Sequence, residues 1–122
     1  MRPNIKVVIN NKIYDVDGYS LSRQQYMLLD GRIVGFDAAS RVLQGTGMDE
    51  YQYSKFTQAK EIYEGDILKF FSKYNQSLMG RVYWAFNKSM WRVDIFKNKY
   101  GYEDIALSDC ICTTVVRNEY QL

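Results

Sequence analysis

Apolar and polar residues alternate in short runs through the first fifty positions, the pattern of β-strands with one buried face. Turn residues punctuate these runs at Asn10-Asn11-Lys12 and at Asp17-Gly18. Asp30-Gly31 is the strongest hairpin signal, because this dipeptide tolerates the positive φ angles of a two-residue hairpin turn. The predicted strands are residues 5–9, 13–16, 26–29, 32–36 and 42–47.

The pattern changes over residues 48–60, which contain no Gly, no Pro and no alternation of apolar and polar positions. Asp49 is a residue type that caps a short helix. We therefore expect a boundary in the chain here, filled over residues 48–65 by a connecting helix or an ordered loop.

From Asp66 onward, five short apolar runs separated by polar turns predict a second group of strands. Their close spacing favours a small closed or nearly closed barrel, which leaves no exposed sheet edge. The predicted fold class is mainly β (β-rich α+β), with an N-terminal β-hairpin unit over residues 1–47 and a β-barrel over residues 66–122. The strands expected in the barrel are residues 66–71, 80–86, 91–96, 105–107 and 111–116.

Alternation along the second and third of these strands assigns a face to each side chain. The inward set is predicted to be Val82, Trp84 and Phe86 on one strand with Trp91, Val93 and Ile95 on the next. The outward set is then Arg81, Tyr83, Arg92, Asp94 and Phe96.

The composition is that of a folded domain, with 47% hydrophobic and 25% charged residues among 122. A net charge of +2 does not by itself indicate a nucleic acid or a membrane partner. No apolar run approaches the ~18 residues of a transmembrane helix, and no signal-peptide pattern is visible. Cys110 and Cys112, one residue apart on a predicted strand, are expected to be free thiols. The expected location is the cytoplasm, without a membrane partner.

Two segments in the centre of the chain form a recognisable pair, Leu43–Met48 (LQGTGM) and Glu61–Lys69 (EIYEGDILK). They resemble the YopX family of phage and prophage proteins, in which a QyTGl element leads into EIYEGDIv. Gly80–Trp84 and Trp91–Val93 are similar to the next two strands of that family. The motif residues are Thr46, Gly47, Glu61, Ile62, Tyr63, Glu64, Gly65 and Asp66.

The resemblance covers residues 40–107 and implies a phage or prophage origin, a host-cell cytoplasm and an SH3-like C-terminal barrel. The polar segment before Glu61 is longer than in the family and lacks its Asp-Lys-Asn-Gly-Lys turn. The FRAWD sequence at the start of the family's proteins is also missing. A variant subdomain is therefore one interpretation of the first forty residues. The family has no established function that could be carried over to a residue.

Catalytic chemistry has few candidates in this sequence. The chain has no histidine, which removes His-based acid–base catalysis and His-containing zinc sites. The carboxylates of Glu61, Glu64 and Asp66 could hold Mg²⁺ or Mn²⁺. The favoured alternative is a turn, in which Gly65 takes an unusual backbone angle and Asp66 opens the next strand, because no non-acidic partner accompanies the group. We predict no catalytic residue, no metal site and no cofactor.

Residues 69–99 carry seven Lys or Arg residues against one acid, Asp94, and many aromatic residues lie between them. Such an outer face binds protein partners through Arg and Tyr, or single-stranded nucleic acid through phosphate pairing and base stacking. An ordinary solvated surface is the third alternative. The chain is therefore predicted to be a non-enzymatic binding module for a protein, which includes copies of itself, with nucleic acid as the alternative partner. The candidate binding residues are Lys69, Arg81, Tyr83, Arg92 and Phe96.

Overall fold

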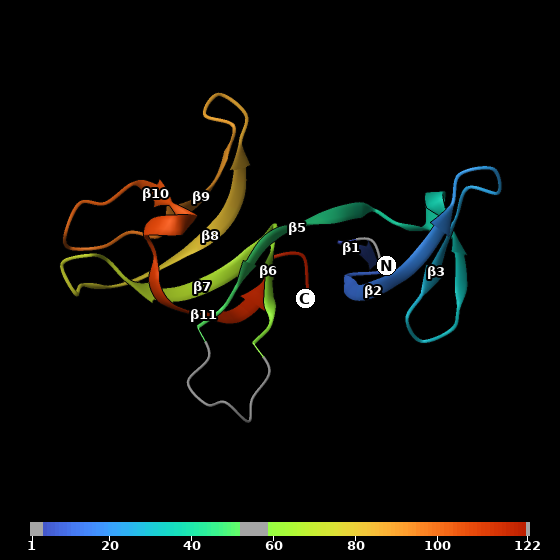
Figure 1. Cartoon of the computed structure of the whole chain (residues 1–122), viewed down its shortest axis with the longest axis horizontal. Helices are drawn as coiled ribbons and strands as arrows, with labels where there is room; N and C mark the ends of the chain where they lie inside the picture. Colours follow the sequence, from blue (N-terminus) through green and yellow to red (C-terminus); the bar gives the residue numbers. More distant parts are fainter. Residues whose placement is uncertain (1–3, 52–58, 122) are drawn as a thin grey trace. The chain divides into compact units, whose positions relative to one another are not determined.

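The computed structural model describes residues 4–51 and 59–121, and strands dominate this part of the chain (Figure 1). The prediction of a mainly β protein is confirmed. No α-helix occurs in the described ranges, and none of their helical turns has the length or apolar character to cross a membrane. The helix or loop predicted over 48–65 differs from what is seen, since strands occupy Met48 and Asp49 and residues 61–63; residues 52–58 lie outside the described residues.

Two compact units make up the chain, one of them formed by the residues up to Gly45 and those from Tyr120 on, the other by Thr46–Glu119. The predicted boundary at residue 47 lies two residues beyond the observed division. The described ends of the predicted connector belong to the second unit.

The first unit is an antiparallel sheet with the strand order β4-β3-β2-β1-β5. The strand β5 continues into the second unit, where its last residues lie beside β6. The elements are β1 (Ile5–Ile9), β2 (Lys12–Ser20), β3 (Gln25–Leu28), β4 (Ile33–Gly35), the 3₁₀ turn η1 (Phe36–Ala38) and β5 (Arg41–Asp49). The predicted end of the second strand at Asp17-Gly18 is wrong, because a bulge between Val16 and Gly18 lets β2 continue to Ser20.

Two of the hairpin turns of this unit differ in detail from the prediction. Asn10 and Asn11, both at positive φ (51° and 63°), form the two-residue turn between paired Ile9 and Lys12. The Asp30-Gly31 turn is a three-residue loop, in which the Leu28 amide donates to the Arg32 carbonyl at 2.8 Å. Here Gly31 alone takes a positive φ (93°), as in a type I turn followed by a bulge.

The core of the first unit is small. Its buried members are Val7, Val16, Tyr26 and Leu28. Partly buried neighbours such as Phe36, whose ring centroid lies 4.6 Å from that of Tyr26, complete it. Val7 comes from β1, and the alternation along β2 and β3 supplies the other three core residues from one face of the sheet. The same alternation is the pattern from which these strands were predicted.

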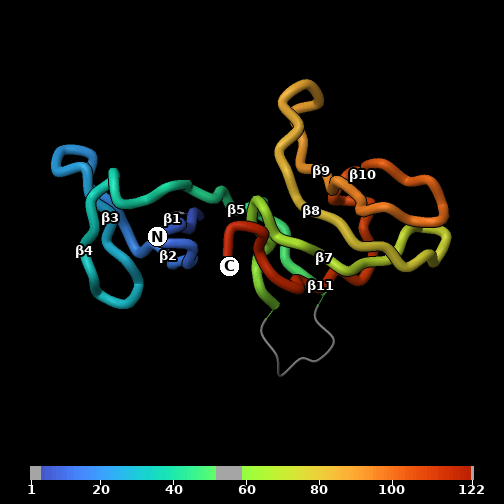
Figure 2. Tube along the Cα trace, turned by 180° about the vertical axis from the view of Figure 1, so that it is seen from behind, coloured from blue at the N-terminus to red at the C-terminus, as the bar shows by residue number. Residues whose placement is uncertain are grey.

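The second unit contains a five-stranded antiparallel sheet with the order β10-β9-β8-β7-β11, so that the last strand returns to pair with the first (Figure 2). All five predicted strands are present, and the structure adds the short β6 inside the segment predicted as a connecting helix or ordered loop. An SH3-like closure beyond this strand order stays a prediction. The elements are β6 (Glu61–Tyr63), β7 (Asp66–Phe71), β8 (Ser77–Ala85), β9 (Met90–Ile95), β10 (Asp104–Ala106), the 3₁₀ turn η2 (Leu107–Asp109) and β11 (Ile111–Asn118).

The core of the second unit is larger and holds the predicted inward residues Val82, Val93 and Ile95. Its full membership is Ile62, Leu68, Phe70, Leu78, Val82, Val93, Ile95 and Leu107. Trp84 and Trp91 face each other across β8 and β9, with ring centroids 5.2 Å apart. The inward position predicted for Phe86 is wrong: β8 ends at Ala85, the alternation ends with it, and Phe86 is 87% exposed in the following turn.

Candidate functional site

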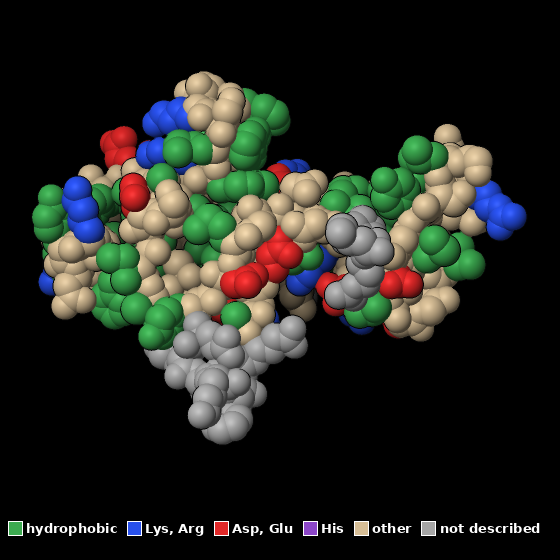
Figure 3. Space-filling view, in the orientation of Figure 1, with side chains coloured by type: hydrophobic (Ala, Val, Ile, Leu, Met, Phe, Trp, Pro, Cys, Tyr) green, Lys and Arg blue, Asp and Glu red, His purple; other side chains and the backbone are tan. Residues whose placement is uncertain are grey.

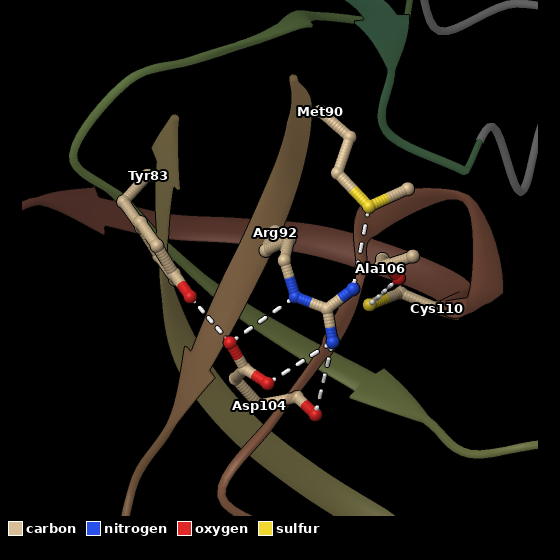
Figure 4. A network of polar contacts seen from close by, with 6 residues as sticks. All are labelled: Tyr83, Met90, Arg92, Asp104, Ala106 and Cys110. Atoms are coloured by element: carbon tan, nitrogen blue, oxygen red, sulfur yellow. Dashed lines mark hydrogen bonds and ion pairs between the residues drawn. The ribbon is translucent and has the colours of Figure 1, made fainter. Parts of the chain in front are cut away.

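The outer face of β8, β9 and β10 carries a polar network centred on Asp104 (Figure 4). The strand register places Arg92 opposite Tyr83 on one side and opposite Ala106 on the other. The Arg92 Nε and Nη2 atoms donate to the two Asp104 carboxylate oxygens at 3.1 and 3.0 Å, and the Tyr83 hydroxyl donates to the same carboxylate. The bidentate ion pair joins β9 to β10, and the Tyr83 hydrogen bond adds β8.

This network is not suited to moving protons near neutral pH. Hydrogen bonds from Arg92 and Tyr83 lower the pKa of Asp104 to about 2. The bond to Asp104 raises the pKa of Tyr83 above its usual value. The carboxylate therefore stays ionised and the phenol stays protonated, and only 14% of the Arg92 side chain is exposed to a ligand.

Arg81, the other arginine predicted to bind a partner, is also engaged within the chain. Its Nη1 atom lies 3.2 Å from Glu119 Oε2, and its Nη2 atom lies 3.5 Å from Asp94 Oδ2. The charges of Arg81 and Arg92 are thus balanced by acids of the same chain, and the binding role of these two arginines stays a prediction. Lys69 and Phe96 remain exposed.

The motif residues around Thr46 and Glu61 form hydrogen bonds that link β5 to β6. The Thr46 hydroxyl donates to the Ile62 carbonyl at 2.7 Å, and the Gly47 amide donates to Glu61 Oε2 at 3.0 Å. Ile62 itself is buried in the core. The Thr-Gly pair and the Glu-Ile pair, 15 residues apart, are therefore explained together: in each, a side chain bonds to a backbone group of the other.

Asp66 closes the turn that follows β6. Its Oδ2 accepts the Tyr63 amide at 2.7 Å, and its Oδ1 accepts the Asn118 side-chain amide at 3.0 Å. Gly65 takes a φ of 84°, so the predicted turn with an unusual glycine angle is confirmed. The same Asn118 amide also donates to the Glu64 carbonyl, which ties β11 to this turn.

The carboxylates of Glu61 and Asp66 are therefore occupied as acceptors of backbone and amide hydrogens. Over residues 4–51 and 59–121, no three side chains of His, Cys, Asp or Glu gather as a metal site would require. The polar side chains of the motif stabilise the fold, because they form hydrogen bonds with backbone groups.

The two cysteines are free. Burial, together with the nearby Asp109 carboxylate, raises the pKa of the Cys110 thiol to about 12, which keeps it protonated and unreactive. Cys112 lies at a positive φ of 54°, within a break in the pairing of β11 with β7. The positive φ of Cys112 is explained by the β-bulge at this point of β11.

A different surface collects the exposed basic and aromatic side chains of the second unit. It lies where the β7–β8 loop and the β9–β10 loop meet, the yellow-green and orange loops of Figure 1. We call it the lysine–aromatic end. Its exposed members are Lys69, Phe71, Lys73, Tyr74, Phe96, Lys97, Lys99 and Tyr100.

Polar side chains hold the two loops of the lysine–aromatic end in place. The Tyr102 hydroxyl donates to Gln76 Oε1 at 2.6 Å and so joins one loop to the other. Asn98 donates to the carbonyls of Phe96 and Tyr102 and accepts the amides of Tyr100 and Tyr102, all within 3.2 Å. The loops are therefore ordered before any partner arrives.

The aromatic rings of this end stand in solvent although its loops are tied down. Tyr74 is 68% exposed and Tyr100 is 42% exposed. Each has a lysine ammonium near its ring, Lys73 at 5.2 Å and Lys99 at 5.3 Å from the ring centres. The space-filling view shows hydrophobic and Lys or Arg side chains side by side over this end (Figure 3).

Sequence reasoning found Lys69 and Phe96 of this surface but placed them with Arg81, Tyr83 and Arg92. The loop tyrosines were not among the predicted binding residues. One signal in the sequence points to the loops: no Asp or Glu occurs in residues 67–93 or 95–102. The acids that neutralise the arginines, Asp104 and Glu119, carry no local signal because only the strand register brings them close.

No family model, curated protein or solved structure matches this chain. The resemblance to the YopX family accordingly stays a prediction carried by the motif residues. The fold and the surface define a class: a β-sheet protein of two units, the second of which presents lysines and aromatic rings on ordered loops.

Proposed function

We propose that the chain is a non-enzymatic binding module and that the lysine–aromatic end is its contact surface. The observation that carries this proposal is the exposure of Tyr74 and Tyr100 on loops that are already held in place. Exposed aromatic rings on rigid loops give a partner a large contact area at a low entropic cost. A phage or prophage accessory protein, as the motif implies, is the biological role we propose for it.

Two other features support this surface over the one predicted from strand alternation. Arg92 and Arg81 are held by acids of the same chain, so a ligand would have to displace those acids. The lysines at 73, 97 and 99 are exposed in their loops. The surface suits either class of partner suggested by the sequence, a protein or a nucleic acid, since both use exposed aromatic side chains.

The test is a capture experiment on the full chain with a double variant, Tyr74→Ala with Tyr100→Ala. Tagged wild-type protein is passed through a bacterial lysate, and both protein and nucleic acid in the eluate are identified. The wild type should retain a partner that the double variant loses. Tyr19→Ala, which removes a 49% exposed tyrosine from the first unit, is the matched control and should retain it.

Melting curves of the three proteins separate loss of contact from loss of folding, since substitutions at exposed positions change stability by about 0.5 kcal/mol or less. Equal capture by the wild type and by a folded double variant would refute the lysine–aromatic end as the contact surface.

A further inference from the structure

The proposed contact surface leaves its partner to be identified, and the side chains of the two loops define a ligand class. We propose that the lysine–aromatic end binds single-stranded nucleic acid, with its lysines on the phosphates and its tyrosines stacked on unpaired bases. This inference rests on the proposed function, because it takes the same loops as the contact surface.

The charge of these loops is mainly positive. The β7–β8 loop contains no Asp or Glu, and the β9–β10 loop contains one, the exposed Glu103. Four exposed lysines stand against it, three of them on the loops and one within β7, two residues before the strand ends. These lysines are Lys69, Lys73, Lys97 and Lys99. Protein interfaces are depleted of lysine, whereas an excess of lysines over acids is typical of surfaces that neutralise phosphates.

Tyrosine and lysine are paired in a way that suits a nucleotide. Lys73 lies next to Tyr74, and Lys99 lies next to Tyr100. The two ammonium groups lie 5.2 and 5.3 Å from the centres of these rings. A base stacked on such a ring brings its phosphate within reach of the neighbouring ammonium. Two such pairs on joined loops provide two stacking positions for one strand.

The exposed rings also favour single strands over duplexes. Bases in a duplex are stacked on one another, so a tyrosine ring can reach their faces only after unstacking them. No such cost arises for a single strand. The stacking is independent of sequence, because every base has an aromatic face.

Fluorescence anisotropy with labelled 15-nucleotide oligomers of dT and of U tests the inference on the purified full chain. A duplex of the same length is the comparison ligand. We expect binding of the single strands and a fall of log K with log salt of slope about −2.8, for four phosphates at about −0.7 each. A preference for the duplex, or an affinity independent of salt, would overturn the inference.

Variants assign the binding to the loops. Lys73→Gln with Lys99→Gln should reduce the magnitude of the salt slope by about 1.4, since two phosphate contacts are lost. Tyr74→Ala and Tyr100→Ala should each weaken binding roughly 5- to 150-fold. Lys12→Gln and Tyr19→Ala, exposed positions of the first unit, are the controls and should leave binding unchanged.

The two proposals fail in different ways. Absence of oligonucleotide binding by the folded wild type overturns the inference alone if capture of a protein still depends on Tyr74 and Tyr100. If binding occurs but is insensitive to these tyrosines, both the inference and the proposed contact surface are wrong.

Discussion

Asp104 shows how a single carboxylate sets the chemistry of a sheet face. It accepts hydrogen bonds from Arg92 and Tyr83 of the two neighbouring strands. It thereby neutralises the charge of Arg92, which side-chain alternation had assigned to the outer surface. A bidentate pair of this kind fixes the positions of β9 and β10 relative to each other. A partner that binds Arg92 would have to displace Asp104 from it.

The pH dependence of stability should report this pairing. The folded-state pKa of Asp104 is about 2, below its ordinary 3.8, so its contribution to stability is present above about pH 4 and is lost as the pH falls toward 2. Asp104→Asn should be less stable than the wild type at pH 7 by up to about 1 kcal/mol, because solvent screens a side chain that is 30% exposed.

Urea unfolding of both proteins between pH 7 and pH 2 measures the difference. The gap between them should narrow below about pH 4 and close near pH 2. Asp94→Asn, whose carboxylate is 56% exposed and lies 3.5 Å from Arg81, is the control and should show a smaller gap. A constant gap from pH 7 to pH 2 would contradict the role given to the Asp104 carboxylate.

Two strands of the second unit approach each other too closely for any side chain larger than hydrogen at one position. A Cβ atom at Gly80 of β8 would lie 2.6 Å from the Asp94 carbonyl oxygen and 3.0 Å from the Ile95 Cα, both backbone atoms of β9. Rotation of a side chain cannot relieve such contacts. Glycine is therefore required at this point of the β8–β9 pairing.

Gly80→Ala should accordingly lower the free energy of unfolding by about 1–3 kcal/mol, the range found for overpacked interiors. Ser77→Ala, an exposed change on the same strand, should shift it by about 0.5 kcal/mol or less. Urea denaturation of the three proteins at neutral pH gives both values. Equal stability of Gly80→Ala and the wild type would show that β9 can move away without cost.

The two units of the molecule differ in the size of their cores. Among the described residues, four buried side chains form the centre of the first core and eight form that of the second. Because burial of apolar side chains is the main favourable contribution to folding, the first unit should open more easily than the second.

Native-state hydrogen exchange followed by NMR should therefore find less protection for the amides of β2 and β3 than for those of β7 and β8. The opening free energies of the second unit should approach that of global unfolding. The same free energy for both sets of amides would show that the chain unfolds as one cooperative body, and the difference between the cores would then have no consequence for local opening.

The local pattern of the sequence was enough to determine the β class and most strand positions, because side-chain alternation and turn residues act over a few neighbours. It also determined the glycine turn before Asp66. It did not distinguish a two-residue from a three-residue hairpin loop at Asp30-Gly31, since both accept a glycine at positive φ.

Only the tertiary structure decided which charged and aromatic residues are left for a partner. Arg81 meets Glu119 across 38 positions of sequence and Arg92 meets Asp104 across 12, so no local pattern reveals either pair. The β7–β8 and β9–β10 loops likewise meet through Gln76 and Tyr102, 26 positions apart. The physical reason is that strand register, and not sequence distance, decides which charged side chains lie close enough to pair.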